Sequence, residues 1–142
     1  MRSIVRVVYA AGALAAGFCF VLSVPNATAQ STVLPTFTAA QAQRGEASYV
    51  SQCAQCHGRD LDNGEFAVPL KGPEFVQHWA GGRLDELFNH ITQKMPPTNP
   101  GGLDLSTYVD VMAYILSQNG IAPSETELPA DPAVLKSMAF PK

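Results

Sequence analysis

Two cysteines three positions apart, followed at once by a histidine, constrain this chain more than any other feature does. The run Cys53-Ala54-Gln55-Cys56-His57 brings two thiols and an imidazole within a short stretch of backbone. Such a cluster can be a thioredoxin-like redox pair, one half of a zinc site, or the attachment point of a covalently bound haem. Each of these needs a different fold around it, so the surrounding sequence decides between them.

The surrounding sequence favours haem attachment. A thioredoxin-like pair lies beside a βαβ unit, and no strand pattern is present near Cys53. A zinc site needs a second pair of ligands, but His78 and His90 are twelve residues apart and lack the spacing of such a pair. Two thiols spaced like Cys53 and Cys56 can each add to one vinyl group of the same porphyrin, and His57 can then bind the iron. We therefore predict one covalently bound haem c.

The first 29 residues have the pattern of an export signal. Two arginines precede an uncharged and mostly apolar stretch of 18 residues, 7–24. Pro25 then breaks any helix, and Ala27-Thr28-Ala29 is the small-residue pattern that signal peptidase cleaves. These features predict a signal peptide over residues 1–29 and a periplasmic protein. The apolar stretch also reaches the lower limit for a membrane span, so an uncleaved anchor is the alternative, and only then would the protein bind a membrane.

The charge after the leader excludes one class of partner. All twelve Asp and Glu lie beyond residue 29, against seven of the nine Lys and Arg, so this segment has a formal charge of −5. A protein that binds nucleic acid needs basic residues to neutralise phosphates. We therefore expect no nucleic acid among the partners.

Apolar residues recur with helical spacing along most of the chain, which predicts an all-α fold of three to five short helices. Residues 30–37 are expected to be a loose lead-in, and the proline-rich tail from about residue 121 to be a strap over the core. The expected helices run from Thr38 to Cys53, from Glu74 to Trp79, from Arg83 to Gln93 and from Ser106 to the stop at Asn119-Gly120, with a last short one starting at Asp131-Pro132.

A haem bound through His57 leaves one face of its iron for another ligand. The candidates after the leader are Met95, Met112, Met138, His78 and His90. We predict Met95, because the prolines that follow it end the preceding helix and leave its side chain uncommitted to a helix face. Met112 belongs to an apolar helical stripe, where a methionine usually packs. His57 and Met95 are therefore the expected metal ligands.

The residues around these motifs resemble those of class I c-type cytochromes over roughly residues 38–120. Gly45 and Tyr49 match the glycine and the aromatic residue of that family's first helix, and Tyr114 matches the last helix, which crosses the first. The resemblance implies that residues 30–142 form a class I cytochrome c fold wrapped around one haem.

The resemblance also implies haem contacts from Pro69, Leu70 and Trp79. Leu70-Lys71-Gly72 matches a family pattern in which a proline two residues earlier lies where a carbonyl accepts a hydrogen bond from the ligand histidine. Here the proline stands one position late, so the acceptor is the carbonyl of Val68 or of Pro69. This hydrogen bond matters because it fixes the tautomer of the histidine and raises its basicity as a ligand.

A narrower resemblance concerns small bacterial cytochromes, and cytochrome domains, that serve periplasmic dehydrogenases such as quinoprotein alcohol dehydrogenases. It implies a periplasmic dehydrogenase as the electron donor and a terminal oxidase or another cytochrome as the acceptor. The matching residues are Phe75 to Trp79, Leu87-Phe88, Met95-Pro96-Pro97, Pro100-Gly101, Tyr108, Ala113-Tyr114-Ile115-Leu116 and Asn119-Gly120.

With His57 and Met95 both on the iron, no face is open to a substrate, and we predict a single-electron carrier that is not an enzyme. One alternative is a dedicated electron-accepting subunit of a dehydrogenase complex. Another is a five-coordinate haem enzyme or sensor, should Met95 not bind. The few basic residues expected near the haem, Lys71, Arg83 and Lys94, predict a partly apolar docking surface around Pro96-Pro97.

Overall fold

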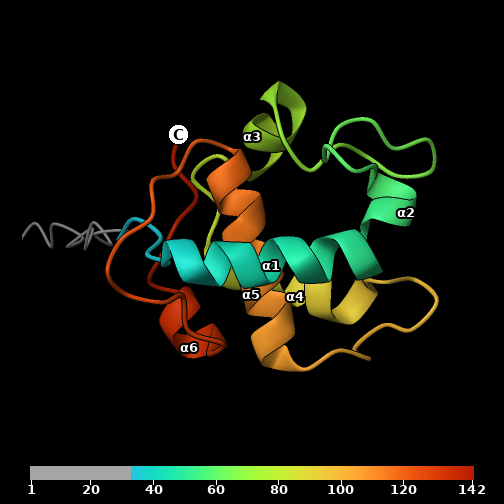
Figure 1. Ribbon diagram of the computed structural model, residues 1–142. Helices are drawn as coiled ribbons and strands as arrows, with labels where there is room; N and C mark the ends of the chain where they lie inside the picture. The colour runs from blue at the N-terminus through green and yellow to red at the C-terminus, as the bar shows by residue number, and fades with distance from the viewer. Residues whose placement is uncertain (1–32) are drawn as a thin grey trace, which may run out of the picture.

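The structure is a computed structural model and describes residues 33–142 (Figure 1). These residues contain no strand, only two isolated bridges, so the all-α prediction is confirmed. The leader predicted over residues 1–29 lies outside the described residues. Among residues 33–142, no helix has the length and hydropathy needed to cross a membrane. The helices are α1 (Ala39–Gln52), α2 (Ala54–His57), α3 (Pro73–Trp79), α4 (Leu84–Lys94), α5 (Leu105–Gln118) and α6 (Pro132–Leu135).

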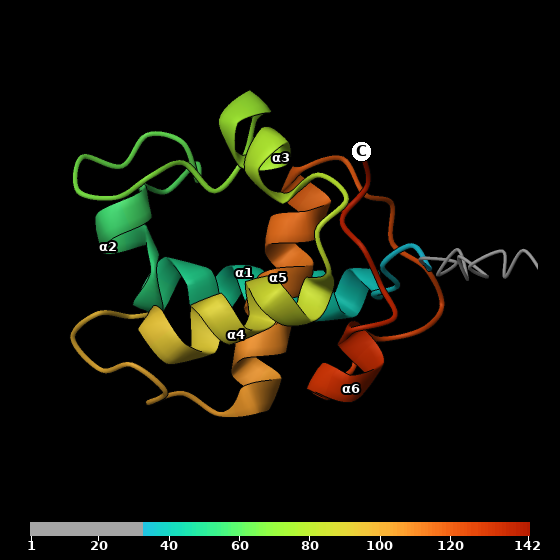
Figure 2. The same ribbon diagram turned by 180° about the vertical axis from the view of Figure 1, so that it is seen from behind.

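The described residues form six helices, one more than the three to five expected, because the first helix ends at Cys53 and the residues after it form a short helix of their own. The backbone of Cys53 has φ −120° and ψ −33°, which leaves the helical range although its N–H still bonds to the carbonyl of Tyr49. The four residues from Ala54 to His57 then form a separate turn, α2. The haem-attachment motif therefore lies at a bend, and its direction differs from that of α1 (Figures 1 and 2).

Capping side chains set two of the helix starts that the sequence predicted. The hydroxyl of Thr38 accepts a hydrogen bond of 3.1 Å from the backbone N–H of Gln41 at the start of α1. The carboxylate of Asp131 accepts one of 2.8 Å from the N–H of Ala133 at the start of α6, where Pro132 occupies the first turn. Each cap satisfies a backbone donor that has no partner inside the helix.

The frame of the molecule is the crossing of α1 and α5 (Figure 1). Gly45 lies at the crossing, where an added Cβ would overlap the carbonyl oxygen of Asp110. One turn further along, the rings of Tyr49 and Tyr114 pack with centroids 5.4 Å apart. The hydroxyl of Tyr49 also donates a 2.6 Å hydrogen bond to the carbonyl of Gly58, so the crossing is linked directly to the segment that follows the cysteines.

Residues 121–142 form a C-terminal strap at the end of the molecule opposite the two long loops, 58–72 and 95–104 (Figures 1 and 2). The strap buries Leu128, Leu135 and Phe140 in the core. No residue of the strap lines the haem-site cavity described below, so the strap closes the far end of the core and does not cover that cavity.

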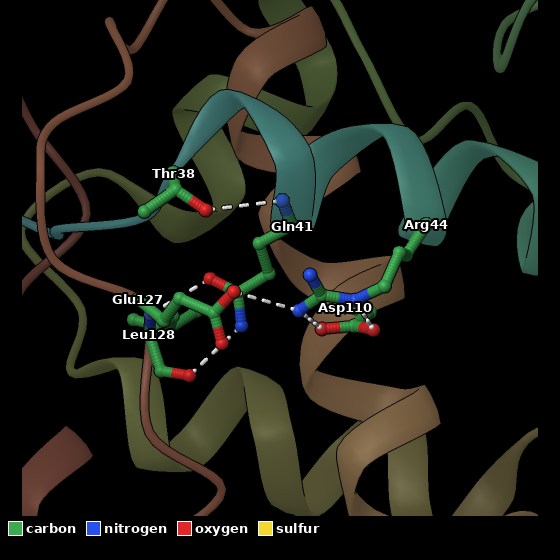
Figure 3. Close-up of polar contacts among 6 residues, drawn as sticks. All are labelled: Thr38, Gln41, Arg44, Asp110, Glu127 and Leu128. Carbon is green, nitrogen blue, oxygen red and sulfur yellow. Dashed lines mark hydrogen bonds and ion pairs between the residues drawn. The ribbon is translucent and has the colours of Figure 1, made fainter.

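Two polar contacts hold the strap against α1 (Figure 3). The side-chain amide of Gln41 donates to the carbonyl of Leu128 at 2.9 Å and accepts from its N–H at 2.7 Å, and Gln41 is buried. The guanidinium of Arg44 bonds to both carboxylate oxygens of Asp110, at 2.9 and 3.1 Å, and to Glu127 at 2.9 Å. Arg44 therefore ties α1 to α5 and to the strap at one point.

The expectation of a loose lead-in is wrong for residues 33–37. The N–H of Val33 bonds to the carbonyl of Ser137, and the carbonyl of Val33 accepts from the N–H of Ala139, both at 3.0 Å. The side chain of Phe37 is fully buried. These partners lie about a hundred residues along the chain, so a local pattern could not indicate them.

Candidate haem site

A cavity of about 550 Å³ lies between the two long loops and the helices that adjoin them. Both loops extend to the same side of the α1–α5 frame in the two views (Figures 1 and 2). The walls are mostly apolar and come from the end of α1, from α2, α3, α4 and α5, and from residues 66–70 and 95–98. This volume falls in the range of roughly 300–1,000 Å³ that is usual for cofactor sites.

Cys53 and Cys56 are free thiols on the wall of this cavity, and both are half-buried. The N–H groups of Cys56 and His57 each bond to the carbonyl of Cys53 at 3.1 Å, which makes the motif a tight turn. Burial, and secondly the neighbouring Cys56, raise the pKa of the Cys53 thiol to about 11.

His57 is oriented by a hydrogen bond to the loop that follows it. The side chain is 7 % exposed, and its Nδ1 lies 2.8 Å from the carbonyl oxygen of Val68. A carbonyl can only accept, so Nδ1 carries the proton and Nε2 is left with a free lone pair. Of the two acceptors that the sequence left open, the carbonyl is that of Val68 and not that of Pro69. His57 thus lines the cavity in the tautomer that a metal ligand needs.

The five candidates for the second iron ligand fall into two groups in the structure. Met95, His78 and His90 line the cavity, whereas Met112 and Met138 are buried in the core away from it. The two histidines are exposed on α3 and α4. Met95 is half-buried at the wall, so it is the one methionine among residues 33–142 whose thioether lines the cavity.

The backbone of Met95 is held in place by a residue from α5. Met95 ends α4 with φ −123° and ψ 147°, and the peptide bond to Pro96 is cis. The hydroxyl of Tyr108 donates a 2.7 Å hydrogen bond to the carbonyl of Met95, and Tyr108 is itself buried. In the sequence, Tyr108 was only one of the residues that match small bacterial cytochromes. Its contact with Met95 was not predicted, because no local pattern connects the two residues.

The remaining predicted haem contacts, Pro69, Leu70 and Trp79, also line the cavity. The indole of Trp79 lies between two histidine rings, with centroids 5.0 Å from His78 and 6.0 Å from His90. All seven residues predicted for the site therefore lie around one cavity.

Some residues of the cavity were not predicted as haem contacts, although the carbonyl of Val68 was one of the two candidate acceptors for His57. Phe66, Ala67 and Val68 lie in the loop after the cysteines, and Phe66 and Val68 are 79 % and 72 % exposed. The available signal was the uncharged and apolar run of residues 66–70 within a loop that is otherwise mostly polar. Further wall residues are Gln52, Gln55, Glu74, Phe75, Leu87, Ile91, Pro96, Pro97, Thr98, Val111 and Ile115.

Basic residues are absent from the walls of the cavity within the part of the chain that the structure describes. Of the three expected near it, Lys71 pairs with Asp62 at 3.4 Å, and Arg83 pairs with Asp85 at 2.9 Å. Glu74 is the one Asp or Glu among the lining residues. The lining of the cavity is therefore mainly apolar and includes no Lys or Arg.

The residues present fit a haem c. Two free thiols in one turn can form the two thioether bonds, and a buried imidazole with a free Nε2 can bind the iron. A thioether on the same cavity supplies a second donor, and the apolar walls suit a porphyrin. Within residues 33–142, no group of three or more His, Cys, Asp or Glu side chains is arranged to hold a bare metal ion.

Comparison with known families gives one match. The family model described as cytochrome c oxidase, cbb3-type, subunit III matches residues 40–115, which is more than half of the chain. The matched region runs from the start of α1 into α5 and includes the two cysteines, His57 and Met95. No curated protein and no solved structure matches the chain.

Proposed function

The chain belongs to the cytochrome c family whose model is that of cbb3-type subunit III, a family of haem-dependent electron-transfer domains, and we propose that it is a periplasmic carrier of single electrons. One haem c is attached at Cys53 and Cys56. His57 and Met95 are its two iron ligands. The observation that carries this proposal is that all four residues line the same apolar cavity.

When bound, the haem supplies a reversible one-electron couple at its iron. The protein holds the iron ligands in fixed positions on a mostly apolar cavity. His57 stays in one tautomer because the carbonyl of Val68 accepts its Nδ1 proton. Met95 would supply the second iron ligand, and its thioether would favour the reduced state of the iron. With His57 and Met95 both bound to the iron, the site would pass electrons and would not bind substrates.

The export signal predicted over residues 1–29 supports a periplasmic location. A periplasmic dehydrogenase is the proposed electron donor, and a terminal oxidase or another cytochrome is the proposed acceptor. The description of the matched family names an oxidase subunit, which supports the oxidase as acceptor. A dedicated subunit of one dehydrogenase complex would differ in a single respect: it would co-migrate with that dehydrogenase on native gels, whereas a free carrier would migrate alone.

Covalent attachment is tested by replacing both Cys53 and Cys56 with Ala. We expect no haem to remain with the chain after denaturation, because no thioether bond can form. A pyridine haemochrome spectrum of wild type should give the c-type form at one haem per chain. Cys19→Ser changes the third cysteine, in the predicted leader, and should leave the attached haem unchanged. Haem that stays attached to the double variant would refute the proposal.

A further inference from the structure

The loop that orients His57 is itself anchored by a residue of the distant helix α5, and we propose that this residue, Asn119, is a positioning residue for the iron ligand. The proposal rests on the function proposed above, since it concerns the same haem site. It adds a residue that lies 62 positions after the histidine on which it acts.

The carbonyl that orients His57 belongs to a segment that cannot hold its own position. Residues 58–72 contain no helix and no strand, so no regular backbone ladder fixes Val68. The side chain of Val68 is 72 % exposed, so packing of that side chain does not fix its backbone either. A hydrogen bond of 2.8 Å to Val68 therefore needs an anchor elsewhere in the loop.

Asn119 supplies such an anchor with both ends of its amide. Its Nδ2 donates to the carbonyl of Leu70 at 2.9 Å, and its Oδ1 accepts from the N–H of Gly72 at 3.1 Å. The same Nδ2 donates to the carbonyl of Ile115 at 2.8 Å, in the last turn of α5. The loop is thereby attached to the end of the helix that crosses α1.

The other hydrogen bonds of this segment are local in the sequence. The N–H of Leu70 bonds to the carbonyl of Leu61 at 2.6 Å, Lys71 pairs with Asp62, and the carbonyl of Gly72 accepts from the N–H of Val76 in the first turn of α3. The side chains of Leu61 and Leu70 also pack in the core, so Asn119 adds a polar anchor to an apolar one. Among the described residues, Asn119 is the only side chain outside the loop, besides His57, that hydrogen-bonds to the backbone of residues 66–72.

The effect of Asn119 reaches the ligand through a short path. Leu70 is two residues from Val68, so a shift of the Leu70 carbonyl is transmitted through two peptide units, which are rigid planes. Without the anchor, the Val68 carbonyl moves relative to Nδ1 of His57, and the ring proton loses its protection from water. Asn119 itself does not touch the iron ligand, so its role is to position it.

The test is hydrogen exchange of the Nδ1 proton of His57, followed by NMR in the reduced, haem-loaded protein. Asn119→Ala removes both ends of the amide, and we expect exchange about tenfold faster, the factor that corresponds to losing one ordinary hydrogen bond. Asn119→Asp is the second variant, should the first fail to fold. It keeps the acceptor for Gly72 but not the donors, and its exchange rate should lie between wild type and Asn119→Ala.

Gln41→Ala is the matched control. Gln41 also pairs its amide with a backbone carbonyl and N–H of a remote segment, those of Leu128, but at the strap end of the molecule. Gln41→Ala should lower the free energy of unfolding by a similar amount and leave the exchange rate of the His57 Nδ1 proton unchanged. Exchange in both Asn119 variants that is no faster than in Gln41→Ala, with haem attached in all of them, would refute the role of Asn119 alone. A wild-type chain without covalent haem would instead refute the proposed function and the positioning role with it.

Discussion

At the scale of single residues, one thioether separates an electron carrier from a haem protein that binds small molecules. Met95→Ala should abolish the weak far-red absorption band that methionine ligation gives in the oxidised protein. It should also lower the midpoint potential, because the thioether favours the reduced iron. The open axial position should then bind imidazole or cyanide much more readily. Absorption spectra and a redox titration measure all three effects.

Met112→Leu is the control for this variant. Met112 is fully buried and does not line the cavity, so a leucine of similar volume should leave the band and the potential as in wild type. The opposite result, with the band lost in Met112→Leu and kept in Met95→Ala, would show that the distal ligand is placed wrongly. A wild-type protein that lacks the band and binds carbon monoxide when reduced would contradict the carrier function itself.

The residues of the site differ in how far along the chain one must look to predict their roles. The cysteines and His57 are adjacent, and Met95 stands beside two prolines, so a local pattern was enough to predict them. The carbonyl of Val68 remained one of two choices, because the difference is a matter of backbone geometry in a loop. Tyr108 and Asn119 could not be assigned roles, since their partners are 13 and 49 residues away.

At the scale of elements, helix spacing and caps predicted five of the six helices among the described residues to within one or two residues. The sixth, α2, was missed because its four residues, Ala54–His57, are too few to show a helical period. The pairing of Val33 with the strap was missed for a different reason. It depends on backbone hydrogen bonds, which carry no residue pattern, between segments at opposite ends of the domain.

The crossing of α1 and α5 makes Gly45 the most sensitive position of the frame. Gly45→Ala should gain about 1 kcal/mol in helix propensity. The added methyl group meets the backbone of Asp110, however, which cannot rotate away as a side chain could. Overpacking costs about 3 kcal/mol in such a case. We expect the free energy of unfolding to fall by about 2 kcal/mol, measured by denaturant unfolding of the haem-loaded protein.

Glu46→Ala, on the exposed side of the same helix, should change the free energy of unfolding by less than about 0.5 kcal/mol. Were Gly45→Ala to be as stable as wild type, the backbones of the two helices would not be in contact at this point.

At the scale of the whole molecule, the distribution of charge and apolar surface bears on how a partner docks. The segment after the predicted leader is acidic, and the lining of the cavity is mainly apolar, with Phe66 and Val68 the two most exposed large hydrophobic side chains of the described residues. A carrier with a basic ring is steered over long distances and slows steeply with salt. This surface favours docking by short-range apolar contact around Phe66 and Pro97.

If the acceptor is the proposed terminal oxidase, Phe66→Ser should therefore slow oxidation of the reduced protein by membranes that contain this oxidase, by about tenfold. That factor corresponds to about 1.4 kcal/mol, which is within the gain from burying part of an aromatic side chain. Val134→Ser, on α6 at the strap end, removes an exposed apolar side chain far from the cavity and should have no effect on the rate. The wild-type rate should change little as ionic strength rises, because burial of apolar surface is not screened by salt. A rate that falls steeply with salt, together with a normal rate for Phe66→Ser, would mean that charged residues outside the cavity direct the partner, and the apolar lining would then have no part in docking.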